Sequence, residues 1–284
     1  MYNKISMFLC LLMATCHLLA KSHSSSAVSK QEMHLLVLCD TRSAQTGRSH
    51  NADCKRIEKN IKQIAKQCRF RPVIHVLRNE QISLDNIEKW ALQIKKFSTA
   101  PLFVYYTGTK EMMATGEQKW PAISIKEKGQ KRLLSVYDIY KKVESLTMSL
   151  KCFFFADCYN DMQHISYEYM DFKHMIQKGR KMKGLPYLFC KPQGSLIACS
   201  AEQNGVAYGI DQKGKTGGLF TLMLCDALAR VTTKPAFWQS VLAEVEAKCL
   251  YFAPDARHSN KAVKQQILCG FEGLVHPDIS LAID

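Results

Sequence analysis

The sequence predicts an α/β fold, in which a mainly parallel sheet of about six strands is covered by helices on both faces. Its 284 residues, of which 47% are hydrophobic and 23% charged, suit one large domain with a sizeable core. Short apolar runs alternate with longer amphipathic segments along the chain, which is typical of strands separated by helices. We find no internal repeat and no low-complexity tract.

Short apolar runs mark the strands of this sheet, and each is apolar enough to be covered on both faces. The expected core strands are residues 34–39, 72–77, 101–106, 152–156, 194–200 and 262–269, with a short edge strand at 122–125.

Helices are expected where apolar residues recur every three or four positions. Ile57, Ile61 and Ile64 fall on one face of the first helix, and Asn51 or Asp53 is expected to cap it. Further helices are expected after Ser83, after Ser135, after Gly217-Gly218 and from Pro235 onward.

The N-terminus has the pattern of a secretory signal. Lys4 precedes an apolar run over residues 7–20, which is too short to span a bilayer. Cleavage is expected after Ala20 or Ala27, so residues 1–27 form the signal and residues 28–284 the mature domain. Lipidation at Cys16 and a buried N-terminal helix are the alternatives. The sequence therefore predicts an exported protein, whether periplasmic, secreted or on the cell surface, with no transmembrane span.

The chain is basic, with a formal net charge of +14. Its lysines and arginines are dispersed over one helical face, residues 55–66, and two expected loops, residues 126–132 and 178–183, which is typical of solvated surfaces. No aromatic residues are interleaved with them as in a nucleic-acid reader, so no specific nucleic-acid partner is predicted. A basic, anion-binding surface protein is an alternative function.

The stretch 170–193 is basic and is interrupted by glycines and prolines. We therefore expect it to form an exposed, protease-accessible linker within the domain.

Twelve cysteines are present, of which Cys10 and Cys16 lie in the expected signal. The others permit disulfides after export. Because no Cys-x-x-Cys pair occurs, the spacing supports neither a zinc site nor thioredoxin-like chemistry. Neither a metal nor another cofactor is predicted.

Two of the strand-like runs end in residues with a potential chemical role. The run VYYTGTK at 104–110 contains Thr109, and the run FFFADC at 153–158 ends in Cys158, 49 positions later. The segments IACSAEQ at 197–203 and GGLFT at 217–221 follow. From about residue 33 to 273 this order resembles the caspase-like cysteine peptidases, and the metacaspase-type members more closely than the animal caspases. The resemblance implies their three-layer fold.

The resemblance also implies roles for individual residues. Cys158 takes the position of the nucleophile, Gly108 that of a backbone donor on the oxyanion side, and Thr109 that of the histidine base. A free thiol with a pKa of about 8.5 is only a few per cent thiolate at neutral pH, so such a peptidase needs its histidine. Threonine cannot accept a proton at neutral pH. The nearest histidine that could act as a substitute base is His164.

Three further positions belong to the substrate cleft of the family. Lys110 stands where the family has a glycine, Ala156 stands where it has a carboxylate that binds a basic substrate residue, and Ser200 lies in a cleft-lining strand. With the histidine replaced, these departures predict a pseudopeptidase that binds a peptide, a protein or a related caspase-like chain. The alternative is an active cysteine endopeptidase that uses Cys158 with a displaced base.

Overall fold

The computed structural model describes residues 31–94, 101–111, 119–147, 151–163, 176, 181–212, 215–252 and 267–275. The chain divides after residue 30, and all of these residues belong to the second unit. The predicted signal, Cys16 and His164 lie outside the described residues, so the inferences drawn from them stay predictions.

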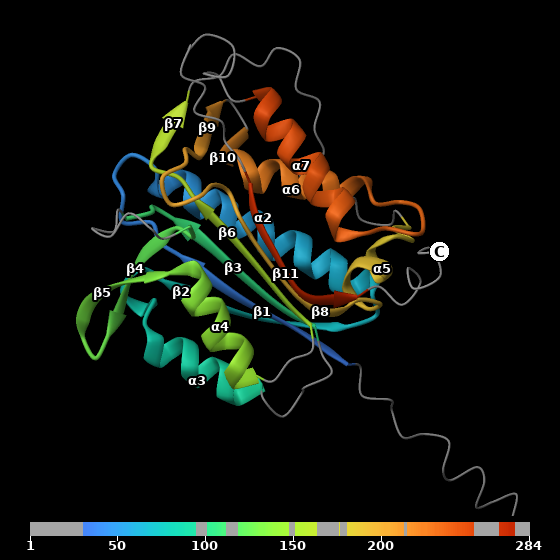
Figure 1. Ribbon diagram of the computed structural model, residues 1–284, viewed down its shortest axis with the longest axis horizontal. Helices are drawn as coiled ribbons and strands as arrows, with labels where there is room; N and C mark the ends of the chain where they lie inside the picture. Colours follow the sequence, from blue (N-terminus) through green and yellow to red (C-terminus); the bar gives the residue numbers. More distant parts are fainter. Residues whose placement is uncertain are drawn as a thin grey trace, which may run out of the picture. The chain divides into compact units, whose positions relative to one another are not determined.

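A six-stranded sheet forms the middle layer of this unit (Figure 1). Its spatial order is β11-β8-β6-β3-β1-β2. The strands are β1 (Glu32–Cys39), β2 (Arg71–Arg78), β3 (Leu102–Gly108), β6 (Cys152–Cys158), β8 (Gln193–Cys199) and β11 (Leu268–Val275). Neighbouring strands are parallel except for β11, which runs antiparallel to β8 at the edge. The predicted mainly parallel sheet is confirmed.

Helices cover both faces of the sheet, as Figure 1 shows. One face carries α3 (Leu84–Ile94) and α4 (Val136–Thr147). The other carries α2 (Gly47–Gln67), α5 (Leu185–Phe189), α6 (Leu219–Arg230) and α7 (Trp238–Phe252). Because both faces are covered, every residue of β3 and β6 is buried.

Alternate residues of a central strand enter two separate cores. Phe153 and Phe155 join the core beneath α2 and α6, whereas Phe154, Ala156 and Cys158 join the core beneath α3 and α4. The face to which a side chain points therefore decides which polar groups can reach it.

Two predicted element boundaries are wrong. The helix α2 begins at Gly47, one residue after Thr46, so Asn51 and Asp53 lie inside the helix and do not cap it. Asp53 is buried and bonds to residues far away in the sequence, as described below. The last strand occupies Leu268–Val275, so it continues beyond the predicted end at residue 269, and residues 262–266 lie outside the described residues.

Two small sheets accompany the central one. A hairpin joins β4 (Ala122–Glu127) to β5 (Gln130–Ser135), and its turn residues Lys128 and Gly129 have φ angles of 49° and 80°. Most of the basic segment 126–132 is therefore strand and not the expected loop. The remaining elements are η1 (Asn79–Gln81), β7 (Asp161–Gln163), β9 (Tyr208–Gln212) and β10 (Lys215–Gly218), the last three forming the other small sheet.

The predicted linker, residues 170–193, is described at residue 176 and over residues 181–193. Here the chain forms α5, whose Leu185, Leu188 and Phe189 are fully buried. The indole nitrogen of Trp238 donates a hydrogen bond of 2.8 Å to the Leu188 carbonyl. This part of the segment is folded onto the core, unlike the exposed linker that the sequence predicted.

Within the described ranges, no helix has both the length and the apolar character needed to cross a membrane.

Candidate functional site

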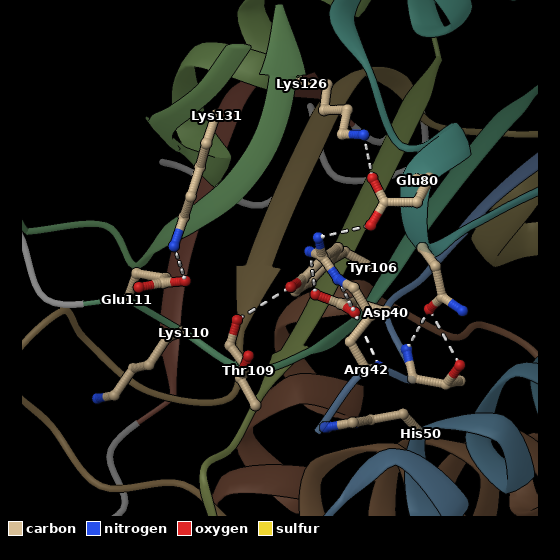
Figure 2. A network of polar contacts seen from close by, with 12 residues as sticks. Asp40, Arg42, His50, Glu80, Tyr106, Thr109, Lys110, Glu111, Lys126 and Lys131 are labelled. Carbon is tan, nitrogen blue, oxygen red and sulfur yellow. Dashed lines mark hydrogen bonds and ion pairs between the residues drawn. The ribbon is translucent and has the colours of Figure 1, made fainter. Parts of the chain in front are cut away.

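The ends of β3 and β6 bring Thr109 and Cys158 to the same edge of the sheet. Gly108 pairs with Cys158 in the parallel register of these strands, and Thr109 is the next residue along the chain. The carboxyl ends of parallel strands are where α/β proteins place their binding and catalytic residues. Figure 2 shows Thr109 among the polar side chains that gather at this edge.

Cys158 is closed off from solvent. Its side chain is only 1% exposed and packs in the core beneath α3 and α4, together with Tyr106, Ala156 and Cys199. Its backbone N–H donates a hydrogen bond of 2.9 Å to the hydroxyl of Ser200. Burial raises the pKa of the Cys158 thiol, and the negative charge of Asp157 raises it further, against the opposing charge of Lys110. The sulfur therefore stays protonated at neutral pH.

Thr109 and Gly108 serve the local backbone. The phenol of Tyr106 donates a hydrogen bond of 3.0 Å to the Thr109 carbonyl, a contact drawn in Figure 2. A side chain on Gly108 would collide with Tyr106 and would lie 2.8 Å from the Cβ of Asp40. Close packing alone thus explains why this residue is a glycine. The role of Gly108 on the oxyanion side stays a prediction.

A buried histidine, His50 of α2, lies near this edge but on the opposite face of the sheet. Its Nδ1 is 3.0 Å from the hydroxyl of Thr107, and its Nε2 is 2.9 Å from the hydroxyl of Thr46. Its ring packs on Tyr159 with a centroid distance of 4.3 Å. Thr107 precedes Gly108 in β3, so its side chain points away from the face that holds the Cys158 sulfur.

Burial lowers the pKa of His50 to about 4, although the charge of Asp40 raises it. Both ring nitrogens already have hydrogen-bond partners, so His50 is not placed to take the Cys158 proton. In the sequence His50 has no motif context, since its partners are Thr46, the residue before α2, and Thr107 of β3. A local feature of the sequence could have indicated its contact with Thr46, because Thr46 lies four residues earlier, at the spacing of one helical turn.

The described residues contain two other histidines. His34 pairs with Leu102 at the opposite end of β3, and His75 lies on the edge strand β2. Neither position is near the end of β6. Within the described part of the chain, no imidazole therefore lies on the face of the Cys158 sulfur at this edge of the sheet.

Lys110 connects three segments at the edge of the sheet. Its ammonium donates to the carbonyls of Gln203 at 3.1 Å, Glu202 at 3.4 Å and Gly205. Its backbone exchanges two hydrogen bonds with the Asn160 side chain, at 3.0 and 3.1 Å. The residue that replaces the expected glycine thus fastens the loop after β8 to the ends of β3 and β6.

The other two positions expected to bind substrate are inaccessible. Ala156 and Ser200 both have an exposed fraction of 0%. Ala156 packs in the core, and Ser200 accepts the backbone hydrogen bond of Cys158. Neither side chain lines an open cleft in this structure.

Two buried aspartates lie on the α2 face, beside this region. Asp157 accepts hydrogen bonds from the N–H of Thr221 at 3.0 Å and from its hydroxyl at 2.6 Å. Asp53 accepts a bond of 2.7 Å from the Gly218 N–H and one of 3.0 Å from the Tyr159 phenol. Burial raises the pKa of Asp157 to about 6 and that of Asp53 to about 8.

These aspartates explain why the segment GGLFT at 217–221 begins with two glycines. Gly217 has a φ of +148°, and a side chain there would collide with Asp53. A side chain on Gly218 would come within 2.6 Å of the carboxyl carbon of Asp157. The two glycines let the backbone approach both carboxyl groups as α6 begins.

Acidic partners engage much of the basic charge near the edge. Arg42 bonds to Asp40 at 2.7 Å and reaches Glu80 at 3.5 Å, and Lys126 also pairs with Glu80 (Figure 2). Lys131 pairs with Glu111 at 2.9 Å, and Arg132 pairs with Glu127. The basic segment 126–132 is therefore largely neutralised, which weighs against an anion site on this surface.

The residues that the structure describes include no group of three or more His, Cys, Asp or Glu side chains arranged to hold a metal ion.

Comparisons with known proteins show the fold. No protein-family model and no curated protein matches the sequence. A solved structure, "structure of pro-sf-caspase-1", has a TM-score of 0.50 at 14% identity, over 86% of this chain and 93% of that chain. Caspase-1 from Spodoptera frugiperda is also 14% identical, with a TM-score of 0.48 over 87% of this chain and 88% of that chain.

The protein thus has a caspase-like fold, as the order of its sequence motifs predicted. It is an α/β domain of this fold in which Gly108 lies beside Cys158 at the edge of the sheet and Thr109 follows Gly108.

Proposed function

We propose that this caspase-like domain is an exported pseudopeptidase, which acts by binding a peptide or protein and does not cut it. The observation that carries the proposal is the position of the Cys158 sulfur, which is buried and, among the described residues, has no imidazole on its face at this edge of the sheet. Loss of a general base alone costs on the order of a hundredfold to ten-thousandfold in rate.

The charges near the thiol support the same conclusion. Asp157 lies directly before Cys158, and its negative charge opposes thiolate formation. Lys110 would favour the thiolate, but its ammonium is bound to the carbonyls of Glu202, Gln203 and Gly205. Burial is the largest effect on the thiol, so the net effect is a poor nucleophile.

The edge strand β11 supports the binding role. Within the described residues β8 is its one strand partner, so its outer edge can pair with an extended segment of another chain. Phe271 on this strand is 40% exposed and offers an apolar contact. A related caspase-like chain is the partner that we propose.

The absence of catalysis is tested with a thiol-directed peptide probe and a library of peptides that contain basic residues. We expect no labelling and no cleavage by the purified mature domain, with an active caspase as the positive control. Thr109→His is expected to stay inactive, because the substituted imidazole would still face a buried sulfur. Labelling or cleavage by the parent that disappears in Cys158→Ala would end the proposal, and a dependence on His164 would identify the displaced base.

Binding through β11 is tested by sedimentation of the mature domain with a candidate caspase-like chain. Phe271→Asp should weaken the complex, because it places a charge in the apolar contact. Leu92→Asp is the matched control, because Leu92 is also exposed, at 53%, but lies on α3.

Export is tested by expressing the full-length chain and measuring the mass of the recovered protein. A mature N-terminus near residue 21 or 28, found outside the cytoplasm, is expected. An intact N-terminus in the cytoplasm would contradict this part of the proposal.

A further inference from the structure

Two partly exposed cysteines meet where α2 and α5 end. Cys68 is the C-terminal cap residue of α2, and Cys190 is that of α5. Both side chains are half-buried, whereas most of the described cysteines are buried. The two thiols share a hydrogen bond, so the sulfurs are in contact.

The backbone around each cysteine is held in place. The Cys68 N–H donates to the Ile64 carbonyl at 2.9 Å, and the Cys190 N–H donates to the Pro186 carbonyl at 2.9 Å. A further bond of 3.3 Å joins the Met182 N–H to the side chain of Gln67. The contact between the thiols is thus part of a larger contact between the two segments.

We propose that Cys68 and Cys190 form a disulfide when the protein meets an oxidant of the thiol-exchange class, such as glutathione disulfide. The Cys190 thiolate attacks one sulfur of the oxidant and releases a glutathione thiolate. Cys68 then loses its proton and attacks Cys190 in the mixed disulfide, releasing the second glutathione. One protein disulfide forms, the oxidant disulfide is reduced by two electrons, and two protons pass to the glutathione thiolates.

The surroundings of the pair favour Cys190 as the attacking thiol. The hydrogen bond from Cys68 lowers the pKa of Cys190, and the charge of Lys151 lowers it further, although burial opposes both. The Lys151 ammonium lies close by, since it donates to the Cys190 carbonyl. The pKa of Cys68 is raised by the same hydrogen bond, so Cys68 is the thiol that resolves the mixed disulfide.

A second pair, Cys39 and Cys54, also shares a hydrogen bond. Both of these side chains have an exposed fraction of 0%, and Arg78 donates to both sulfurs, at 3.6 and 3.3 Å. An oxidant as large as glutathione disulfide cannot reach them without local opening. Accessibility therefore distinguishes the proposed disulfide from this buried pair.

The disulfide would join the two sides of residues 170–180, the first part of the predicted linker. Cys68 precedes residues 170–180 and Cys190 follows them. A chain cut within that segment would stay covalently connected until it is reduced. This consequence holds whether or not the domain is a pseudopeptidase.

The test is a disulfide map of the mature domain after incubation with glutathione disulfide. Free thiols are blocked with iodoacetamide, and the unreduced protein is digested with trypsin and analysed by mass spectrometry. We expect the tripeptide of residues 67–69 to be linked to the peptide that contains Cys190 in most molecules. Cys68→Ser and Cys190→Ser should each abolish the link, and thermal unfolding in reductant should show that both variants fold.

Cys249→Ala is the matched control, because Cys249 is buried in α7, and it should leave the link unchanged. If Cys68 and Cys190 are instead recovered alkylated, or if Cys68 is linked to another cysteine, the proposal is wrong.

Discussion

Replacing Asp157 with asparagine should reduce the fall in the free energy of unfolding as the pH rises. Burial raises the pKa of this carboxyl group to about 6, whereas aspartate in an unfolded chain titrates near a pKa of about 3.9. The folded state therefore binds the proton more tightly than the unfolded state. The stability gained from this proton is present below about pH 4 and is lost as the pH rises through about 6.

The size of the effect follows from the difference between the two pKa values. A raised pKa of about 6 exceeds the ordinary value of 3.8 by about two units, and each unit corresponds to about 1.4 kcal/mol. Between about pH 4 and pH 8, ionisation of Asp157 should therefore lower the free energy of unfolding by about 3 kcal/mol. Asparagine carries no such charge, and its carbonyl oxygen can still accept the hydrogen bonds of Thr221.

The assay is urea denaturation of the parent and of Asp157→Asn across this pH range. Asp53 and His50, whose pKa values are also shifted, are present in both proteins. Because the charge of Asp157 helps to raise the pKa of Asp53, the difference between the two curves reports Asp157 together with this coupling. Between about pH 4 and pH 8, the free energy of unfolding should fall by about 3 kcal/mol more in the parent than in the variant. Parallel curves would refute the reasoning, because they would show that the Asp157 carboxyl group binds its proton equally well in the folded and unfolded states.

Three further outcomes follow from the edge of the sheet. Ser200→Ala should lower the free energy of unfolding by about 1–3 kcal/mol, because it leaves the buried Cys158 N–H without its acceptor; an unchanged urea midpoint would contradict this. Lys110→Met should speed amide hydrogen exchange in residues 202–205, which its ammonium holds; equal exchange in parent and variant would show that the loop is fixed by other contacts. In the reduced protein, iodoacetamide should modify Cys158 at least about a hundredfold more slowly than Cys190, since Cys158 is buried and has the higher pKa. The two rates are measured by mass spectrometry, and similar rates would mean that the Cys158 sulfur is accessible.

The central sheet could be predicted because its signal is local. β3 and β6 are runs in which every residue is buried, and such runs are visible in the sequence alone. The start of α2 could not be predicted in this way. Asp53 resembles a helix cap in the sequence, but its carboxyl group serves Gly218, a residue 165 positions away.

Of the hairpin of β4 and β5, the short strand at residues 122–125 was predicted, but the second strand was missed for a different reason. Its outer positions carry lysine and arginine, which the sequence predicted to be a loop, but acidic partners such as Glu80 and Glu111 neutralise several of them. The two turn residues, Lys128 and Gly129, were the available signal, since a turn with two positive φ angles is typical of a tight hairpin.

The sequence motifs predicted that Thr109 and Cys158 belong to the ends of adjacent strands, but they could not predict that the sulfur is buried. That property depends on the core beneath α3 and α4, in which Cys158 is clustered with residues of neighbouring strands such as Tyr106 and Cys199. Side-chain closure of this kind is set by tertiary packing and leaves no periodic pattern in the sequence.

The anchoring role of Lys110 means that a glycine at this position would have a structural cost. The residue beside Thr109 holds the loop at 202–205 through its ammonium, so glycine at this position would release that loop from its anchor. An imidazole at position 109 would still meet a shielded sulfur. Building a cysteine-histidine pair at this edge would thus require coordinated changes, one of which removes the contacts of Lys110.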